Sequence, residues 1–254
     1  MKMETVFCRP ESMTDKVYGY CPGCSHGIAQ RLITEVIDEM GFRENLIGVV
    51  GSGCYGNARE NFNFDVIQTL HGRGPAVATG LKRTHPDLMI FTLQGDGDLA
   101  SIGTAEAIHA ANRGERFTTI FLNNANYGMT GGQVAPTTLL GQITPTTPKG
   151  RSADHMGYPI PILEMISLTR GVAYATRCAL NSPQNINRAK RSIRRAFETQ
   201  QAGLGYSIVE LLSMCPAGWR LKPIEALKWM DEKQMKEYPL VELKVTPLEK
   251  EKAA

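Results

Sequence analysis

The sequence lacks the features that mark membrane, secreted or nucleic-acid-binding proteins. No apolar run approaches the roughly 20 residues that cross a bilayer. The first seven residues, Met1 to Phe7, do not form the apolar core of a secretory signal. A net charge of +3 over 254 residues is too small to indicate a nucleic-acid partner. We therefore expect a cytoplasmic protein that has neither a membrane nor a nucleic acid as its partner.

The sequence gives only weak evidence for a histidine metal site or for a basic docking surface. The five histidines are scattered and none stands at an HExxH-like spacing, so a histidine metal site is not expected. Basic residues gather only between Arg188 and Arg195, at helical spacing. Such a cluster is typical of the solvated face of a helix, and a docking surface for an acidic partner is the alternative.

What is present is the composition and pattern of a parallel α/β protein. With 42% hydrophobic and 21% charged residues, the chain is globular rather than disordered or collagen-like. Segments with helical periodicity lie at 26–40, 74–83, 99–113 and from residue 182 onward. Runs typical of strands lie at 46–50, 88–94, 118–122, 171–176 and 206–211. Their alternation predicts a twisted parallel sheet with helices on both faces.

We expect two parts along the chain. Residues 1–222 should form a single α/β domain that carries the functional sites. Residues 223–254, with several prolines and many charges, should form a C-terminal extension with one short helix at about 223–238 and a partner-bound or partly flexible tail. Residues 127–162 are rich in Gly, Thr and Pro and lack periodicity, which predicts an active-site loop.

The most informative motif is Gly95-Asp96-Gly97-Asp98, directly after the predicted strand at 88–94. Asn123 and Asn124 end the next strand. Because ligands of open α/β sheets bind beyond the carboxyl ends of strands, Asp96 and Asn124 could face one divalent cation. A metal-bound diphosphate suits such a site, since Gly97 would let a phosphate approach the backbone. The alternative is structural, with Asp96 capping a helix and Asn124 forming a turn.

Cysteines form the second group of candidate ligands. Because thiols stay reduced in the cytoplasm, the six cysteines should not form disulfides. Cys21 and Cys24 form a Cys-x-x-Cys motif before the first helix, and Cys54 and Cys215 follow predicted strands. Four thiolates could hold structural zinc, the motif could be a redox dithiol, and single cysteines could fill the core. Core packing is the better interpretation of Cys178.

The spacing of Gly95-Asp96-Gly97 and, 25 residues later, Asn123-Asn124 resembles the thiamine-diphosphate motif of the thiamine enzymes. The resemblance implies that Asp96, the Asn124 side chain and the Asn126 carbonyl bind Mg²⁺, which in turn holds the diphosphate. The residues thereby assigned to cofactor binding are Gly53, Cys54, Gly95, Asp96, Gly97, Asp98, Leu99, Asn124, Tyr127, Gly128, Met129 and Thr130.

The longer match, through residues 127–133, is similar to the beta subunit of 2-oxoacid:ferredoxin oxidoreductases. This resemblance implies catalytic contacts for His71 and Arg73, with a structural hydrogen bond as the alternative for His71. Gly131 stands where relatives carry Lys, which removes a cation for a distal carboxylate and favours a branched-chain or small 2-oxoacid over 2-oxoglutarate. The implied ligands of a 4Fe-4S cluster are Cys21, Cys24, Cys54 and Cys215.

The implied reaction converts a 2-oxoacid, coenzyme A and oxidised ferredoxin to acyl-coenzyme A, carbon dioxide and reduced ferredoxin. Thiamine enzymes need a glutamate against the aminopyrimidine ring, and in this family another domain supplies it. We therefore expect a hetero-oligomer with an alpha subunit that carries this glutamate, a gamma subunit and a ferredoxin-like delta subunit. The alternatives are a non-redox thiamine-diphosphate decarboxylase or carboligase subunit, and a zinc-stapled interaction module.

Overall fold

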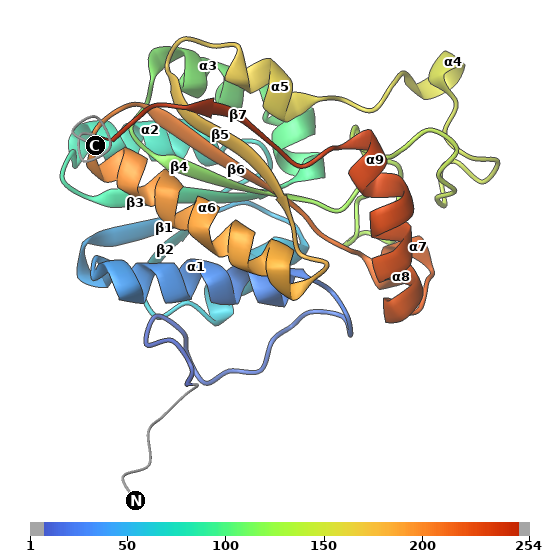
Figure 1. Cartoon of the computed structure of the whole chain (residues 1–254), viewed down its shortest axis with the longest axis horizontal. Coiled ribbons are helices and arrows are strands. Elements are labelled where there is room, and N and C mark those ends of the chain that lie inside the picture. Colours follow the sequence, from blue (N-terminus) through green and yellow to red (C-terminus); the bar gives the residue numbers. More distant parts are fainter. Residues whose placement is uncertain (1–7, 249–254) are drawn as a thin grey trace, which may run out of the picture.

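The computed structural model describes residues 8–248, in which seven strands form one sheet (Figure 1). The strands lie in the order β2-β1-β3-β4-β6-β5-β7. Their bounds are β1 Leu46–Val50, β2 Asp65–Gln68, β3 Met89–Gly95, β4 Thr118–Asn123, β5 Val172–Ala179, β6 Tyr206–Leu212 and β7 Val241–Val245. Strands β1 to β6 pair in parallel, and β7 pairs antiparallel with β5. The predicted parallel α/β fold is confirmed.

The central strands are buried over their whole length. Every residue of β3, β4 and β6 is buried, as expected for apolar strands whose two faces are both covered. β2 lies at the edge and is mostly exposed, and its backbone pairs with β1 from Ile47↔Asp65 to Val50↔Gln68. The parallel direction brings the ends of β1, β3 and β4 to one edge of the sheet, here called the carboxyl edge.

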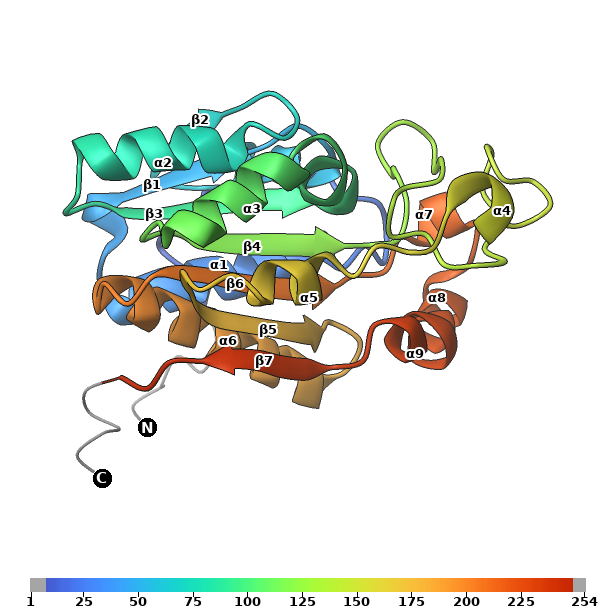
Figure 2. The same cartoon turned by 90° about the horizontal axis from the view of Figure 1, so that it is seen from above.

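Helices cover both faces of the sheet (Figure 2). α1 (His26–Met40) and α6 (Pro183–Gln201) pack together on one face, where Ile33 and Phe197 belong to the same core cluster. α2 (Gly74–Thr84), α3 (Thr104–Arg113) and α5 (Ile162–Ser167) cover the other face over a second cluster. α1 ends at Gly41, which has a left-handed conformation (φ 70°). Within residues 8–248, no helix is both long and apolar enough to cross a membrane.

The helix predicted at 99–113 is wrong in its first part. Residues Asp98–Ile102 form a π-helical turn, and α3 begins only at Thr104. A close backbone contact explains the break, because a Cβ on Gly103 would lie 2.7 Å from the Cα of Gly72. Ser101, which lies within the π-helical turn, has non-helical angles (φ −119°, ψ −106°). The tertiary contact with Gly72 therefore overrides the local helical propensity.

The chain after Cys215 packs beside the carboxyl edge and returns to the sheet. α7 (Pro216–Trp219) is followed by a helical run made of α8 (Pro223–Trp229), η4 (Met230–Gln234) and α9 (Met235–Glu237). This run matches the helix predicted at about 223–238. Because β7 joins the same sheet, the boundary placed after residue 222 stays a prediction. Residues 249–254 of the predicted tail lie outside the described residues.

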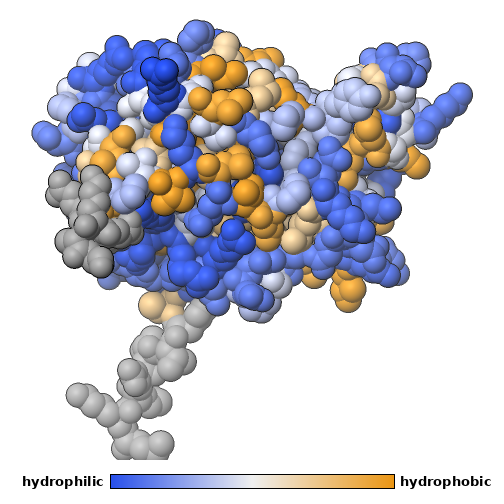
Figure 3. Space-filling model, turned by 45° about the horizontal axis from the view of Figure 1, so that its top comes forward, coloured by the Kyte–Doolittle hydropathy of each residue, from blue (hydrophilic) through white to orange (hydrophobic). Residues whose placement is uncertain are grey.

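Residues 127–161 form a long loop that contains one short helix, α4 (Ala153–Met156). The loop stands out from the body of the molecule as a lobe (Figures 1 and 3). The buried guanidinium of Arg151 holds it together by donating to the carbonyl oxygens of Ala135, Pro136 and Tyr158 at 3.1, 2.9 and 2.9 Å. The loop is thus ordered by its own hydrogen bonds, and its first residues reach the carboxyl edge.

Candidate functional site

A cavity of about 490 Å³ lies at the carboxyl edge, beyond β1, β3 and β4. The predicted metal ligand Asn126 and the predicted catalytic residue His71 line it. The predicted cofactor residues that line it are Gly53, Cys54, Gly95, Asp96, Gly97, Asp98, Asn124, Tyr127, Gly128, Met129 and Thr130. The structure therefore gathers residues from four separate segments around one cavity.

Asp96 is a buried carboxylate with three hydrogen-bond donors around it. The backbone N–H groups of Gly97 and Asn126 donate to it at 2.8 and 3.1 Å, and the Thr137 hydroxyl donates at 2.8 Å. Burial nevertheless raises the pKa of Asp96 to about 7, although these donors oppose the shift. A negative charge here needs further compensation, which a cation would supply.

The side-chain amide of Asn124 also lies next to Asp96. One terminal atom of its amide lies 3.1 Å from Oδ2 of Asp96 and 2.9 Å from the carbonyl oxygen of Asn126. If this atom is the nitrogen, it donates to both oxygens; if it is the oxygen, three oxygens face one another and need a cation between them. Neighbouring ligands of octahedral magnesium lie about 3 Å apart, given metal–oxygen bonds of 2.0–2.1 Å. The Asn124 amide thus lies at the spacing of neighbouring magnesium ligands from both Asp96 and the Asn126 carbonyl.

Replacing Thr137 with Val should weaken magnesium binding, because Asp96 loses the hydroxyl that orients its carboxylate. The loss of an outer hydrogen bond to a metal ligand typically lowers metal affinity about 10- to 100-fold. A Mg²⁺ titration of thiamine diphosphate binding to the assembled protein measures the effect. Thr137→Ser keeps the hydroxyl and serves as the control. Equal magnesium affinities for the two variants would contradict this role of Thr137.

Glycines of the motif make room for aromatic rings. A Cβ on Gly97 would lie 2.0 Å from Cε1 of Tyr127, and a Cβ on Gly95 would lie 2.6 Å from Cε1 of Tyr55. Gly97 has φ −70°, which any residue adopts, so space rather than conformation requires glycine there. In this structure the Tyr127 ring occupies the space that a Cβ on Gly97 would need, whereas the sequence suggested that a phosphate would approach the backbone there.

Asp98 forms the side of the cavity next to the end of β1. Its carboxylate accepts hydrogen bonds from the Tyr55 hydroxyl at 2.7 Å, from the Gln94 amide at 3.3 Å and from the backbone N–H of Gly72. Nδ1 of His71 lies 3.9 Å from the same carboxylate, and the His71 ring is half exposed at the cavity wall. This position lets His71 reach a bound ligand, and its catalytic role stays a prediction.

Among the residues predicted for catalysis and cofactor binding, two lie outside the cavity lining. Arg73 pairs with Glu106 and donates to the carbonyl oxygen of Ile102 at 2.8 Å, so its guanidinium joins the π-helical turn to α3. Its predicted catalytic role has no geometric support here. Leu99 is fully buried in the core beneath α2 and α3, so only its backbone could contribute to a cofactor site.

The four predicted cluster ligands share one region near the cavity. Cys24 precedes α1, Cys54 opens the 3₁₀ helix η2 (Cys54–Glu60), and Cys215 precedes α7. The pKa of Cys24 is raised to about 12, chiefly by burial and with smaller contributions from Cys215, Cys54 and Cys21. Burial also raises the pKa of Cys54 to about 11, with contributions from Cys215 and Cys21. Such thiols keep their protons at neutral pH until a metal displaces them.

The spacing of these thiols distinguishes between kinds of metal centre. Within residues 8–248, no three His, Cys, Asp or Glu side chains meet as a site for one metal ion. A zinc ion would need its sulfurs about 2.3 Å from one point. An iron–sulfur cluster is a larger body that is held by thiolates spread around it. The thiols are therefore compatible with a cluster.

Gly128 lies where the thiols meet the predicted metal site. A Cβ on Gly128 would be 3.3 Å from Sγ of Cys215, 3.5 Å from Sγ of Cys54 and 3.5 Å from the side-chain amide of Asn124. The two groups of candidate ligands are thus separated by little more than one glycine.

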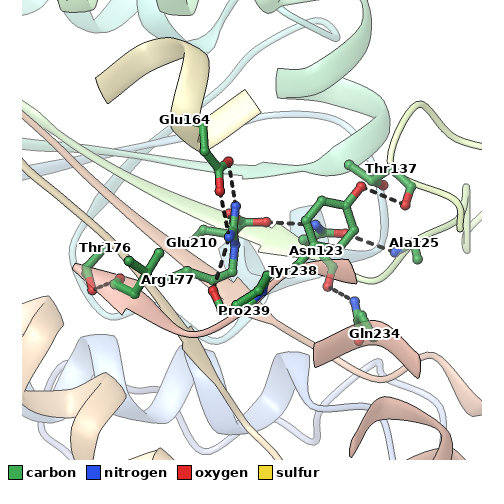
Figure 4. Close-up of polar contacts among 11 residues, drawn as sticks. Asn123, Ala125, Thr137, Glu164, Thr176, Arg177, Glu210, Gln234, Tyr238 and Pro239 are labelled. Atoms are coloured by element: carbon green, nitrogen blue, oxygen red, sulfur yellow. Dashed lines mark hydrogen bonds and ion pairs between the residues drawn. The ribbon is translucent and has the colours of Figure 1, made fainter. Parts of the chain in front are cut away.

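A buried ionic network supports the strand end that carries Asn123 (Figure 4). Arg177 on β5 donates to Glu210 on β6 at 2.7 Å, and the Asn123 amide donates to the other oxygen of Glu210 at 2.7 Å. Arg177 also donates to Glu164 of α5 at 2.8 and 2.9 Å. Both Arg177 and Glu210 are almost completely buried. The network fixes Asn123, directly before the predicted ligand Asn124.

The C-terminal segment adds two hydrogen bonds to the same region (Figure 4). The Gln234 amide donates to the carbonyl oxygen of Asn123 at 2.9 Å. The Tyr238 hydroxyl donates to the carbonyl oxygen of Thr137 at 3.0 Å. Because Thr137 donates in turn to Asp96, the C-terminal segment stabilises the surroundings of the predicted metal site.

Sequence reasoning missed several residues of the site. His26, Ser52, Tyr55 and Leu122 also line the cavity. The ring of His26 is buried against Ser213, with Nδ1 3.0 Å from Oγ, and burial lowers the pKa of His26 to about 4. Ser52 and Tyr55 lie in the glycine-rich run 51–56, which was an available signal. His26 and Thr137 have no signal in the sequence.

Comparisons with known proteins agree with this geometry. A model of the family described as thiamine pyrophosphate enzyme, C-terminal TPP binding domain, matches residues 51–205. The ketoisovalerate oxidoreductase subunit VorA of Methanothermobacter thermautotrophicus is 43% identical over 238 residues, which cover 94% of this chain and 50% of that protein. The 2-oxoglutarate synthase subunit KorB of Archaeoglobus fulgidus is 35% identical over 213 residues, which cover 84% of this chain and 75% of that protein. The chain therefore spans about half the length of the VorA relative.

A solved structure shares the fold. It is that of 2-oxoglutarate:ferredoxin oxidoreductase from Magnetococcus marinus with 2-oxoglutarate, coenzyme A and succinyl-CoA bound. The TM-score is 0.77 at 22% identity, over 96% of this chain and 86% of that one. At this identity the likeness concerns the fold alone.

Proposed function

This chain belongs to the thiamine pyrophosphate enzyme family, among the subunits of 2-oxoacid:ferredoxin oxidoreductases, and we propose that it binds Mg²⁺, thiamine diphosphate and a 4Fe-4S cluster. In the proposed reaction the assembled enzyme converts a 2-oxoacid, coenzyme A and two oxidised ferredoxins to acyl-coenzyme A, carbon dioxide and two reduced ferredoxins. One observation carries the proposal: Asp96 and Asn124 meet at a cavity, and Asn124 and the thiols of Cys54 and Cys215 all lie next to Gly128.

Asp96, the Asn124 side chain and the Asn126 carbonyl would hold the magnesium ion, which prefers oxygen ligands. The buried charge of Asp96 supports this assignment, because the residues around it supply donors but no cation. When bound, thiamine diphosphate supplies a carbanion that attacks a 2-oxo group and stores the electrons released by decarboxylation. The rings of Tyr55 and Tyr127 would shape the cavity and exclude water from it.

Cys21, Cys24, Cys54 and Cys215 would hold the cluster. The raised pKa values of Cys24 and Cys54 support a metal centre rather than free thiolates. A cluster is favoured over a single zinc ion because, within residues 8–248, no three candidate ligands meet at one point, whereas a cluster is held by thiolates spread around it. The closeness of Cys54 and Cys215 to the predicted diphosphate site gives the electrons a short way out of the cofactor. A non-redox thiamine enzyme would have no use for this arrangement.

The remaining half of the active site would come from other subunits. The cavity is open at the carboxyl edge, and three apolar side chains near it are exposed: Leu70 by 78%, Ile102 by 55% and Met129 by 55%. Apolar residues around an open site are typical of a surface that another protein covers. We assign this face to an alpha subunit that carries the glutamate for the aminopyrimidine ring. Gamma and ferredoxin-like delta subunits would complete the enzyme, which we place in the cytoplasm.

A branched-chain 2-oxoacid is the proposed substrate. Gly131 leaves the 127–133 segment without a cation for a second carboxylate. The relative named for ketoisovalerate is 43% identical to this chain, and the one named for 2-oxoglutarate is 35% identical. Both observations favour 2-oxoisovalerate or a similar acid over 2-oxoglutarate.

Metal analysis of the anaerobically purified protein tests this function. We expect about four irons per chain, a brown chromophore that bleaches on reduction, and magnesium-dependent binding of thiamine diphosphate. Cofactor binding without iron would favour the non-redox thiamine enzyme. One zinc per chain, without cofactor binding, would favour the interaction module and overturn the proposal.

A further inference from the structure

The side chain of Asn126 has no role in the metal site, which would use only the carbonyl oxygen of this residue. The residue is 1% exposed, and Nδ2 of its amide is buried without a hydrogen-bond partner. A buried donor that is left unpaired costs free energy, because it has lost its hydrogen bonds to water. An apolar residue would avoid this cost. The amide therefore needs a hydrogen-bond acceptor that is weak while it is a metal-free thiol and strong once it is a thiolate bound to the cluster.

The Asn126 amide lies against Cys215. A Cβ on Gly218 would be 2.0 Å from Nδ2 of Asn126 and 2.8 Å from Sγ of Cys215, so both atoms flank the same glycine. Burial raises the pKa of Cys215, and the backbone N–H of Gly218 and the nearby side chain of Asn126 oppose that shift. A thiol is a weak acceptor, and a thiolate is a much stronger one.

We propose that the side-chain amide of Asn126 donates a hydrogen bond to the thiolate of Cys215 and thereby raises the reduction potential of the cluster. The inference rests on the proposed function, in which Cys215 is a cluster ligand. Reduction adds negative charge to the cluster and its sulfurs, so a donor aimed at a sulfur stabilises the reduced state. Asn126 is a positioning residue in this role, since it acts through Cys215.

The same residue thus serves both centres. Its carbonyl oxygen faces the Asn124 amide at 2.9 Å, on the side of the magnesium site, while its side chain faces the sulfur. Cys24 and Cys54 receive their donors from the backbone, through the N–H groups of His26 and of Cys54 itself. Backbone donors are fixed by the fold, whereas Asn126 can be exchanged without moving the chain. A substitution at Asn126 can therefore change the reduction potential of the cluster.

Redox titration followed by electron paramagnetic resonance tests the inference on the assembled holoenzyme. Asn126→Leu keeps the approximate size of the side chain and removes the donor, and Asn126→Ala removes it without adding bulk. Both variants should keep their iron, because Asn126 is not among the predicted ligands of the cluster. In both, the midpoint potential of the cluster should become more negative than in the wild type.

Gly218→Ala provides an independent variant in which residue 126 is still asparagine. The added methyl group would meet Nδ2 of Asn126 and Sγ of Cys215, and it should push the donor away from the sulfur. We expect a shift of the potential in the same direction. Asn61→Ala is the matched control, because Asn61 is also a buried asparagine but donates to the carbonyl oxygen of Lys16 at 2.8 Å.

The outcomes separate this inference from the function on which it rests. A wild-type protein without iron would overturn the proposed function. Iron-loaded variants at Asn126 whose potential equals that of the wild type would overturn the hydrogen bond to Cys215. Loss of iron from both Asn126 variants would also overturn it, because the residue would then be needed for assembly of the cluster rather than for its potential.

Discussion

Asp96→Ala should abolish the magnesium-dependent binding of thiamine diphosphate and leave the iron content unchanged. The variant removes the only charged oxygen among the three predicted magnesium ligands, Asp96, Asn124 and Asn126. Loss of an outer hydrogen bond already lowers metal affinity by about 10- to 100-fold, so loss of the anionic ligand itself should exceed about 100-fold. Calorimetric titration of the assembled protein with cofactor at fixed Mg²⁺ measures the effect.

The fold should survive this substitution. Burial raises the pKa of Asp96 to about 7, which means that its charge is disfavoured in the metal-free protein. Removing that charge therefore should not unfold the chain, although Thr137 and two backbone N–H groups lose an acceptor. Asp96→Asn keeps the shape of the side chain and should also lose most of the magnesium affinity.

Asp87→Ala is the matched control for Asp96. Asp87 is exposed in the turn before β3, at the opposite end of the strand that leads to Asp96. Its loss should leave cofactor affinity and iron content as in the wild type. If Asp96→Ala bound the cofactor as tightly as Asp87→Ala, the assignment of the metal site would be refuted.

Arg177→Met should lower the free energy of unfolding by about 3–5 kcal/mol, because it breaks a buried ion pair and leaves the partner charge behind. Arg177 and Glu210 are at most 1% exposed, and their contact is 2.7 Å long. Urea denaturation of the purified chain measures the loss. Arg191→Met, on the exposed face of α6, is the control and should change stability by less than about 0.5 kcal/mol.

The loss should depend on pH with a definite sign. Burial raises the pKa of Glu210, and Arg177 opposes that shift, so the carboxyl of the variant should take up a proton at higher pH than the unfolded chain does. The folded variant then binds more protons than the unfolded one, and its stability falls as pH rises through this raised pKa. The double variant Arg177→Met/Glu210→Gln removes both charges and should recover most of the stability. A double variant as unstable as the single one would contradict the ion-pair explanation.

Hydrophobic pattern and glycine positions were enough to predict the centre of the fold. The strands β3 and β4 are continuous apolar runs because both of their faces are covered, and α1 ends at Gly41 because glycine adopts φ 70° without strain. The strand-end rule then placed Asp96 and Asn124 at the same edge, where the structure has them.

The two edge strands could not be predicted from side chains. β2 is four residues long and mostly exposed, and β7 alternates polar with apolar residues at partial exposure. Both exist because their backbones complete the hydrogen bonding of a neighbour, β1 or β5. Such pairing depends on where the chain returns in space, which a local pattern does not contain.

The support around the metal site was equally hidden. Thr137 reaches Asp96 across 41 residues, and Tyr238 reaches Thr137 across 101. The path of the 127–161 loop and the docking of the C-terminal helices decide these contacts. A single threonine in a loop that is rich in threonine carries no mark of this role.

The antiparallel direction of β7 has a practical consequence for labelling. The cavity opens beyond the carboxyl ends of the parallel strands, but β7 runs the other way, so the chain after Val245 leaves from the opposite end of the sheet (Figure 2). A fluorophore attached near Leu248 would therefore sit far from the cavity. An affinity tag joined there would immobilise the protein with the cavity turned toward the solution.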